Sequence, residues 1–279
     1  MKEKDSRQRY LIVGGVAGGA TAAARIRRLT EDAEIILFEK GGHISYANCG
    51  LPYYIGGVIT DRERLFVQTP EAFGRRFNID VRVNSEVTAI DTQAKTVSVR
   101  TTAGREYTER YDRLLLSPGA SPVRPPLPGI GSEGIFTLRN VEDTDRIKAY
   151  MEQKNVRRAV IVGGGFIGLE MAENLTHAGA EVSVVEMAPQ VMTPIDFSMA
   201  ALVHEHLVEK GVRLYLGQAV EAFAHDGEEL TVRLKTGMEL KADIVLLSIG
   251  VRAETHLAEK AGIRLGEMRG IYVDEYLQT

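Results

Sequence analysis

The chain has 279 residues, of which 44% are hydrophobic, a formal net charge of −4 and a single cysteine. This length suits one large or two medium domains, and the hydrophobic content is enough for a buried core in each. The charge predicts neither a nucleic-acid partner nor an anionic membrane, and the lone cysteine excludes an internal disulfide framework and suits a reducing cytoplasm.

The N-terminal segment imitates a secretory signal, because four basic residues precede the apolar run 11–24: Lys2, Lys4, Arg7 and Arg9. Glycines interrupt this run at the point where a strand should turn into a helix, so we interpret it as the start of the fold. No run is long and apolar enough to span a bilayer, and we therefore expect a soluble protein.

Two strand–helix–strand patterns follow along the chain, each typical of a βαβ unit with parallel strands. They lie at residues 10–13, 20–29 and 34–39, and again at 159–162, 168–178 and 181–186.

Each pattern is followed by short β-prone runs, at 79–83, 96–99 and 113–116 and again at 212–216, 230–234 and 244–249. This internal self-similarity predicts two copies of one α/β fold. The proline-rich stretch 118–128 indicates a stiff connection. We predict that residues 1–117 and 245–279 form one discontinuous domain, into which residues 118–244 are inserted as the second.

The second copy carries a complete glycine-rich nucleotide loop, with Gly163, Gly165 and Gly168 in G-x-G-x-x-G register. The first glycine allows the tight turn, the second lets the backbone approach a pyrophosphate, and the third lets helix and strand pack closely. Glu186 ends the next strand, where a carboxylate accepts hydrogen bonds from ribose and repels a 2′-phosphate. The pattern predicts a dinucleotide site that prefers NADH over NADPH.

The first copy departs from this pattern, because Gly14 and Gly19 are in place but Val16 occupies the middle glycine position. Glu39 lies twenty positions past Gly19, as a ribose-binding acid should. A degenerate strand–helix turn is the alternative, but the duplication favours a second nucleotide site.

The lone thiol, Cys49, lies among polar and small residues just ahead of a predicted helix start at Pro52. A helix N-terminus favours the thiolate, so the pattern predicts a reactive cysteine rather than a buried, inert one. One sulfur cannot close an internal disulfide, so its oxidised form must pair with an external thiol or stop at a sulfenic acid.

Basic side chains nearby are weaker candidates. Arg25 and Arg28 lie three apart on one predicted helix face and suit a phosphate, although a solvated charged face is the alternative. His43 is a candidate to tune Cys49, with a solvated loop histidine as the alternative. His204 and His206 lie two apart on a predicted helix and so on different faces, and we predict no metal site.

Four segments together carry a family resemblance: 14–20, 45–54, 114–120 and 137–140, of which the run Asn-Cys-Gly-Leu-Pro-Tyr-Tyr is specific. With them the chain resembles the coenzyme A-disulfide reductase family, which belongs to the single-cysteine flavin-dependent pyridine nucleotide–disulfide oxidoreductases. It is most similar to members that also carry a C-terminal rhodanese domain. The resemblance implies two Rossmann-like, three-layer ββα nucleotide-binding domains of the glutathione reductase type.

The resemblance implies that FAD binds the discontinuous domain and NAD(P)H the inserted one. The implied cofactor-binding residues are Gly14, Gly15, Val16, Ala17, Gly18, Gly19, Glu39, Lys40, Val87, Ser117, Pro118, Gly119, Gly163, Gly165, Phe166, Ile167, Gly168, Glu186 and Gly250. Phe166 is similar to the aromatic residue that covers the flavin until nicotinamide displaces it.

For the substrate, the implied contacts are Thr21, Arg25, Arg28, Ser45, Tyr46 and Asn48. A lysine of the family falls on Phe77, and neighbouring Arg75 or Arg76 is a candidate to replace its charge. NADH would pass hydride to the flavin, and Cys49, as the catalytic thiol, would attack coenzyme A disulfide.

The resemblance also implies a cytoplasmic enzyme that is a homodimer when full length. In the family, a further FAD-binding strand and the dimerisation domain follow the position of Thr279, so we expect this span to retain FAD weakly. Three alternatives remain: an NADH oxidase or peroxidase that cycles Cys49 through sulfenic acid, a persulfide or polysulfide reductase, and a flavin redox sensor without turnover. Oxidases of this kind usually carry a histidine in the first glycine loop, where this chain has Ala17.

Overall fold

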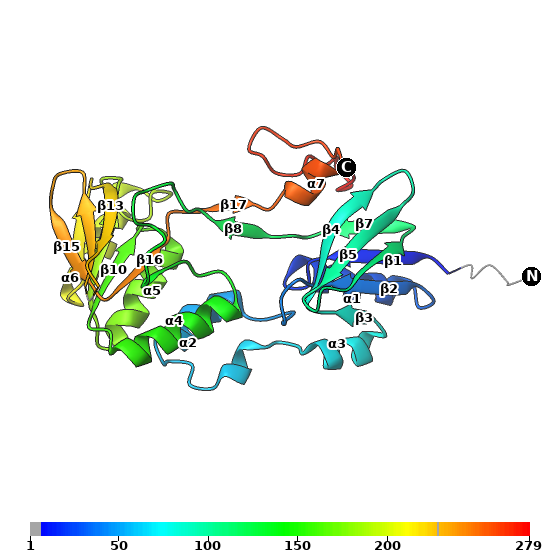
Figure 1. Cartoon of the computed structure of the whole chain (residues 1–279), viewed down its shortest axis with the longest axis horizontal. Coiled ribbons are helices and arrows are strands. Elements are labelled where there is room, and N and C mark those ends of the chain that lie inside the picture. The colour runs from blue at the N-terminus through cyan, green and yellow to red at the C-terminus, as the bar shows by residue number, and fades with distance from the viewer. Residues whose placement is uncertain (1–6, 228) are drawn as a thin grey trace, which may run out of the picture. The chain divides into compact units, whose positions relative to one another are not determined.

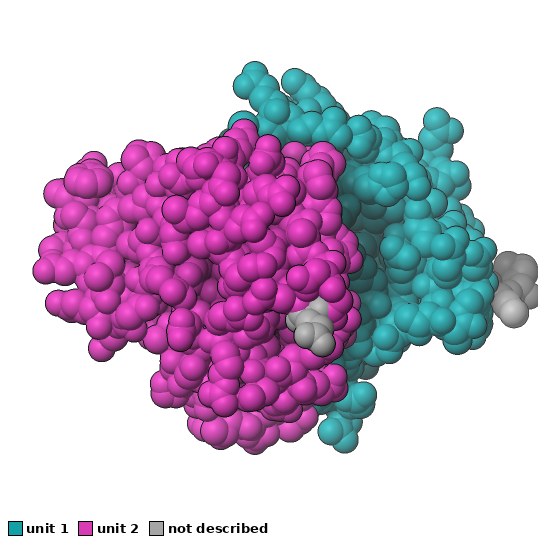
Figure 2. Space-filling view, turned by 60° about the vertical axis from the view of Figure 1, so that its left-hand side comes forward, with its two compact units in different colours: residues 1–47, 66–120, 253–279 teal, residues 48–65, 121–252 magenta. Residues whose placement is uncertain are grey.

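The computed structural model describes residues 7–227 and 229–279, so Lys2 and Lys4 of the signal-like segment lie outside the described residues. The chain forms two compact units (Figures 1 and 2). Unit 1 comprises the chain up to Ala47 together with 66–120 and 253–279, and unit 2 comprises 48–65 and 121–252.

Unit 1 contains a parallel sheet in the order β3-β2-β1-β7 and an antiparallel sheet in the order β4-β5-β6. Its elements are β1 (Arg9–Val13), α1 (Gly18–Leu29), β2 (Glu34–Phe38), α3 (Pro70–Phe77), β3 (Asp80–Arg82), β4 (Ser85–Asp91), β5 (Thr96–Thr101), β6 (Glu106–Arg110), β7 (Arg113–Leu116) and α7 (His256–Lys260).

The parallel sheet of unit 1 is buried on both faces, which is why its strands read as continuous apolar runs. Successive side chains of β1 point to opposite faces. Ile12 packs with buried alanines of α1 on one face, whereas Leu11 packs with Val97 and Val99 of the antiparallel sheet on the other. The unit therefore has three layers: helices, parallel sheet and antiparallel sheet.

Unit 2 repeats this plan with a parallel sheet in the order β12-β11-β10-β16-β9 and an antiparallel sheet in the order β13-β14-β15. Its elements are the short helix η1 (Asn48–Gly50), α2 (Leu51–Ile55), η2 (Arg62–Leu65), β9 (Ile135–Phe136), α4 (Val141–Lys154), β10 (Arg158–Val162), α5 (Phe166–His177), β11 (Glu181–Glu186), α6 (Phe197–Glu209), β12 (Arg213–Leu216), β13 (Val220–His225), β14 (Leu230–Leu234), β15 (Glu239–Ala242) and β16 (Ile244–Leu247).

The duplication is visible in the pairing of strands. β1 pairs in parallel with β2 and β7, and β10 pairs in parallel with β11 and β16. β8 (Ala120–Pro122) and β17 (Val251–Ala253) form a two-stranded sheet where the chain passes from one unit to the other. The predicted pair of Rossmann-like ββα domains is confirmed.

The limits of the units differ from the predicted domain boundaries in two places. β16 pairs with β10 and β9, so the chain leaves unit 2 after Arg252 rather than at residue 244. Residues 48–65 belong to unit 2, because α2 packs against α4 and α5 (Figure 1). The predicted boundaries placed both segments in the discontinuous domain, although the internal repeat grouped the run 244–249 with the second copy.

In the described residues, no helix has both the length and the apolar character needed to cross a membrane.

Candidate nucleotide, thiol and anion sites

The first glycine loop joins β1 to α1 and tolerates no side chain at its ends. Gly14 has a φ of +98°, and a Cβ there would lie 2.0 Å from the carbonyl oxygen of Ser117. A Cβ at Gly19 would lie 1.8 Å from the carbonyl oxygen of Gly14. Both positions therefore require glycine, as the predicted turn and close packing demand.

The second loop, between β10 and α5, has the same geometry. Gly163 has a φ of +108°, and a Cβ there would lie 2.4 Å from the carbonyl oxygen of Ser248. A Cβ at Gly168 would lie 2.1 Å from the carbonyl oxygen of Gly163. The equivalence of Ser117 and Ser248, which follow β7 and β16, extends the duplication to the loops.

The two loops differ at the middle glycine position, which is Val16 in the first loop and Gly165 in the second. A Cβ added at Gly165 meets nothing within 4 Å, so the backbone borders open space. No side chain caps α1 at Ala17 or α5 at Gly165, which leaves the amides of both first turns for a ligand. Uncapped amides, the positive end of the helix dipole and glycine at the close approaches fit the pyrophosphate of a dinucleotide in each unit.

The acidic residues at the ends of β2 and β11 are tied to the loops. Glu39 accepts hydrogen bonds from the amides of Gly15 at 2.8 Å and Gly41 at 2.9 Å. Glu186 accepts from the amides of Gly164 and Ala188, each at 2.7 Å. A carboxylate has further lone pairs for ribose hydroxyls, so each residue can hold its loop and a nucleotide together. The sequence analysis predicted the contact with ribose but not the hydrogen bonds from these carboxylates to the loop amides.

The other predicted cofactor residues lie around these loops. Phe166 and Ile167 open α5 and are exposed, and Lys40 is exposed beside Glu39. Val87 is buried in the core between the two sheets of unit 1. Gly18 is the first residue of α1, and Pro118, Gly119 and Gly250 lie in the loops that follow β7 and β16.

Cys49 lies in η1 and is exposed, which removes the buried, inert alternative. The predicted helix start is confirmed, since α2 begins at Leu51 with Pro52 in its first turn. The pKa of Tyr53, on α2, is raised by the carboxylate of Glu173, then by burial, Glu170 and Cys49. Tyr53 therefore keeps its proton at neutral pH in the neighbourhood of the thiol.

The segment that bears Cys49 is fastened to unit 2 by several contacts. Arg62 donates hydrogen bonds to the carboxylate of Asp145 on α4, from Nε at 2.9 and 3.1 Å and from Nη2 at 2.7 Å. Lys148, one turn further along α4, donates to the carbonyl oxygen of Tyr54 at 3.1 Å, and its Nζ lies 4.8 Å from the Tyr54 ring centroid. These contacts fix the backbone on the C-terminal side of the thiol.

Two of the histidines make contacts with neighbouring residues of the fold. The ring of His43, in unit 1, lies 4.6 Å from that of Phe66, and its predicted influence on Cys49 stays a prediction. His204 accepts a hydrogen bond from the amide of Val191 at 3.1 Å. Within 7–227 and 229–279, no cluster of three His, Cys, Asp or Glu residues is arranged to hold a metal ion.

A cavity of about 390 Å³ lies within unit 1. Its lining includes four of the predicted substrate residues: Thr21, Arg28, Ser45 and Tyr46. Arg25 does not line it, and Asn48 belongs to unit 2, beside Cys49. Of the two candidates for the missing lysine charge, Arg76 lines the cavity and Arg75 does not.

The chain belongs to the pyridine nucleotide-disulphide oxidoreductase family, whose model matches residues 8–279. Members of this family use FAD and NAD(P)H, in agreement with the two loops. The resemblance noted in the sequence is confirmed by curated relatives and solved structures.

Among curated relatives, the chain is 35% identical to an NADH oxidase of Methanocaldococcus jannaschii, over 97% of this chain and 60% of the relative. It is 33% identical to a coenzyme A disulfide reductase of Staphylococcus haemolyticus, over 98% and 60%. The chain thus spans about 60% of the length of these relatives.

Among solved structures, reduced CoADR-RHD of Bacillus anthracis superimposes with a TM-score of 0.95 at 52% identity, over 98% of this chain and 49% of that one. An NAD-dependent persulfide reductase from A. fulgidus superimposes with a TM-score of 0.92 at 38% identity, over 97% and 51%.

Proposed function

We propose that this chain carries the nucleotide sites and the reactive thiol of an NAD(P)H-dependent enzyme that reduces coenzyme A disulfide, or a persulfide of the same thiol, at Cys49. The observation that carries the proposal is the cavity of unit 1, which combines arginine and hydroxyl side chains with apolar walls. Such a lining suits a substrate with a phosphorylated handle.

Each unit would bind a different cofactor. The loop from Gly14 to Gly19, with Glu39, would hold FAD, and the loop from Gly163 to Gly168, with Glu186, would hold NAD(P)H. When bound, FAD supplies to the cysteine sulfur the two electrons that it takes from NAD(P)H.

Cys49 would act as the nucleophile. Its thiolate attacks one sulfur of the disulfide, the substrate S–S bond breaks, and the first thiol leaves as a thiolate while a mixed disulfide forms on Cys49. Two electrons and a proton then release the second thiol and restore the cysteine. The exposure of Cys49 supports this role, because an external disulfide must reach the sulfur.

An NADH oxidase that cycles Cys49 through sulfenic acid is the second candidate, favoured by the relative from Methanocaldococcus jannaschii. Oxygen and peroxide need no basic cavity of this size, and Ala17 stands in the loop where such oxidases usually carry histidine. A persulfide reductase, like the similar protein from A. fulgidus, would use the same residues as the disulfide reductase. We also propose, on the resemblance, a cytoplasmic homodimer.

Steady-state rates with NADH on coenzyme A disulfide, polysulfide, peroxide and oxygen test the proposal. We expect the highest kcat/KM on coenzyme A disulfide or its persulfide, and loss of that turnover in Cys49→Ser. Mass spectrometry of Cys49 as isolated adds a second readout, since a coenzyme A adduct, a persulfide and a sulfenic acid differ in mass. Preference for oxygen with a sulfenic acid on Cys49 would support the oxidase instead.

A further inference from the structure

We propose that His204 is a positioning residue of the second nucleotide site, and that its protonation weakens the binding of the dinucleotide. The ring of His204 holds the segment 187–196, which joins β11 to α6, against the second glycine loop, and it does so only while its Nε2 carries no proton. This inference rests on the part of the proposed function that places NAD(P)H at the loop from Gly163 to Gly168. His204 acts through the segment and has no part in the chemistry at Cys49.

The segment 187–196 packs directly on the glycine loop. The amide of Met192 donates a hydrogen bond to the carbonyl oxygen of Gly164 at 2.9 Å. The side chain of Val191 lies beside the same glycine, since a Cβ added at Gly164 would lie 2.9 Å from Val191 Cγ1. Glu186 accepts from the amide of Gly164 at 2.7 Å, so residues 186–192 hold both backbone polar groups of this glycine. A shift of the segment would therefore disturb the loop backbone that faces the nucleotide.

The segment depends on side chains for its own position, because it contains neither helix nor strand. Met192 has a φ of +52°, in the left-handed region that residues with bulky side chains seldom adopt. Gln190 donates from Nε2 to the carbonyl oxygen of Ile195 at 2.8 Å. From α6, Nε2 of His204 accepts a hydrogen bond from the amide of Val191 at 3.1 Å. Val191 is fully buried, so the loss of this bond would leave a buried amide without its partner.

The direction of this hydrogen bond fixes the protonation state of His204. A backbone amide can only donate, so Nε2 must accept, and the ring must be the neutral tautomer that carries its proton on Nδ1. A second proton, taken from solvent at Nε2, would turn the acceptor into a donor and set two N–H groups against each other. Histidine is the side chain that ordinarily changes its charge between about pH 5 and pH 8. Acidification in this range should therefore detach Val191 from α6.

The charged groups around His204 do not pair with it. On β11 the carboxylate of Glu186 is held by two amides, and on β12, which packs against α6, Arg213 pairs with Glu181. The other titratable groups on these elements are Tyr215 of β12, Asp196 at the start of α6, and Glu205, His206 and Glu209 of α6 itself. In the part of the chain that the structure describes, no carboxylate lies within ion-pair distance of His204, and the nearby ring is that of Phe197, at 6.3 Å between centroids. The fold thus supplies a partner for the neutral ring and no anion for the protonated one.

The test measures the affinity for NAD⁺, which can bind the loop without passing hydride to a flavin. Titration calorimetry from about pH 8 to about pH 5 gives the dissociation constant. His204→Gln places an amide oxygen as many bonds from Cα as Nε2 and does not titrate, whereas His204→Phe keeps a ring without an acceptor. The matched control is His206→Gln, because His206 is exposed and lies on another face of α6. Hydrogen exchange of the Val191 amide, followed by NMR spectroscopy, reports on the segment without any nucleotide.

In the unmodified protein and in His206→Gln, we expect the dissociation constant for NAD⁺ to rise by about twofold to tenfold as the pH falls, the range for one neutral hydrogen bond. The protection of the Val191 amide against exchange should decrease over the same range. His204→Gln should keep the tight binding of pH 8 at the lower pH, and His204→Phe should bind weakly at both. The proposal would be overturned by a dissociation constant that does not change with pH in the unmodified protein, or by the same pH dependence in His204→Gln.

A further variant, Gly163→Ala, separates this proposal from the proposed function. If Gly163→Ala binds NAD⁺ as well as the unmodified protein does, the proposed nucleotide site fails, and the role of His204 fails with it. If Gly163→Ala abolishes binding while His204→Phe changes neither the affinity nor the exchange of Val191, the nucleotide site stands and the role of His204 fails. If the pH dependence follows His204 but no disulfide is reduced, the role of His204 stands and the proposed substrate fails.

Discussion

Glu39 and Glu186 occupy equivalent places at the ends of β2 and β11, and each holds two backbone amides. One of the amides belongs to the glycine loop and the other to the residues that follow the strand. Each carboxylate therefore sets the shape of the nucleotide site before any ligand arrives, and its charge also bears on whether a 2′-phosphate is accepted.

Replacing Glu186 separates these two effects. In Glu186→Ala, loss of the loop contacts should weaken the binding of both nucleotides. Loss of the negative charge should remove the repulsion of the 2′-phosphate, which only NADPH carries. We expect the affinity for NADH to fall by about tenfold to a hundredfold. The ratio of the affinity for NADH to the affinity for NADPH should also become smaller. Dissociation constants for both nucleotides check this, with Glu181→Ala at the exposed start of β11 as the control. If the ratio of the two affinities stays the same, Glu186 does not contribute to the choice between NADH and NADPH.

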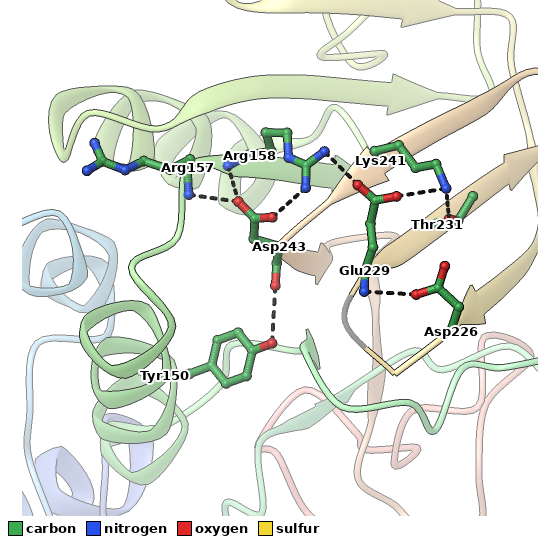
Figure 3. Close-up of polar contacts among 8 residues, drawn as sticks. All are labelled: Tyr150, Arg157, Arg158, Asp226, Glu229, Thr231, Lys241 and Asp243. Carbon is green, nitrogen blue, oxygen red and sulfur yellow. Dashed lines mark hydrogen bonds and ion pairs between the residues drawn. The ribbon is translucent and has the colours of Figure 1, made fainter.

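At the scale of elements, a polar network joins β10, β14 and β15 in unit 2 (Figure 3). Asp243 accepts hydrogen bonds from the amides of Arg157 and Arg158 and from the Arg158 side chain, at 2.8–2.9 Å. Glu229 bridges Arg158 and Lys241, each at 2.9 Å. The network thus links β10, the central strand of the parallel sheet, to the antiparallel sheet of the same unit.

Unit 1 repeats the central contact of this network, because the carboxylate of Asp112 accepts a hydrogen bond from the amide of Arg9 at 2.7 Å. Arg9 and Arg158 begin β1 and β10, and Asp112 and Asp243 precede β7 and β16. A carboxylate at this point aligns two parallel strands at their N-terminal ends, opposite to the nucleotide loops. We interpret both aspartates as structural.

The network makes the stability of unit 2 depend on pH. Burial alone would raise the pKa of Asp243, but hydrogen bonds from Arg158 and from the two amides hold it below the usual value. A pKa lowered by folding adds stability above the ordinary value, about 3.9, and that stability is lost as pH falls through the folded value. Asp243→Asn should therefore cost about 1–3 kcal/mol at pH 7 and less near pH 3.

Thermal unfolding of both proteins at several pH values measures this difference. Glu239→Gln is the control, because its pair with Arg233 is half-exposed, and such a pair contributes about 1 kcal/mol or less. A difference between Asp243→Asn and the unmodified protein that stays constant down to pH 3 would contradict the role of the charge.

The segment 48–65 carries Cys49, on which the proposed chemistry depends. Gly56 ends α2 so close to α5 that an added Cβ would lie 2.7 Å from the Asn174 carbonyl oxygen. With Arg62 on Asp145 and Lys148 on Tyr54, this close approach holds the cysteine-bearing segment against two helices of unit 2. α5 also begins at the second glycine loop, so one helix borders both the nucleotide site and the segment of Cys49.

At the scale of the whole molecule, the chain is two copies of one nucleotide-binding plan that keep separate loops. Gly14 and Gly163 each adopt a positive φ and each approach a serine carbonyl oxygen of their own unit. Each loop is completed by strands of its own unit. A substitution that disrupts one loop should therefore leave the other loop able to bind its nucleotide cofactor.

Alanine substitutions test this independence. Gly14→Ala should lose FAD and keep NADH binding, and Gly163→Ala should lose NADH binding and keep FAD, because an added Cβ forces each turn apart. Flavin absorbance and NADH titration measure the two sites, and far-ultraviolet circular dichroism reports folding. Gly104→Ala, where φ is +81° but a Cβ meets nothing within 4 Å, controls for backbone strain alone. Loss of both cofactors in either variant would show that the units do not bind independently.

The sequence by itself determined both βαβ units, the two glycine loops and their partners Glu39 and Glu186. These features follow from local rules: alternating and continuous apolar runs, glycine where φ is positive, and a fixed distance from loop to acid. They need no knowledge of which distant elements touch, and the strands and helices therefore lie close to their predicted positions.

Only the tertiary structure decided that residues 48–65 pack on unit 2, that unit 2 extends to Arg252, and that Arg76 rather than Arg75 lines the cavity. It also decided that Arg27 is occupied by carbonyl oxygens while Arg28 faces the cavity. Adjacent residues of one helix differ by about 100° in direction. Their roles therefore depend on which remote surfaces pack around the helix, and that information is not local in the chain.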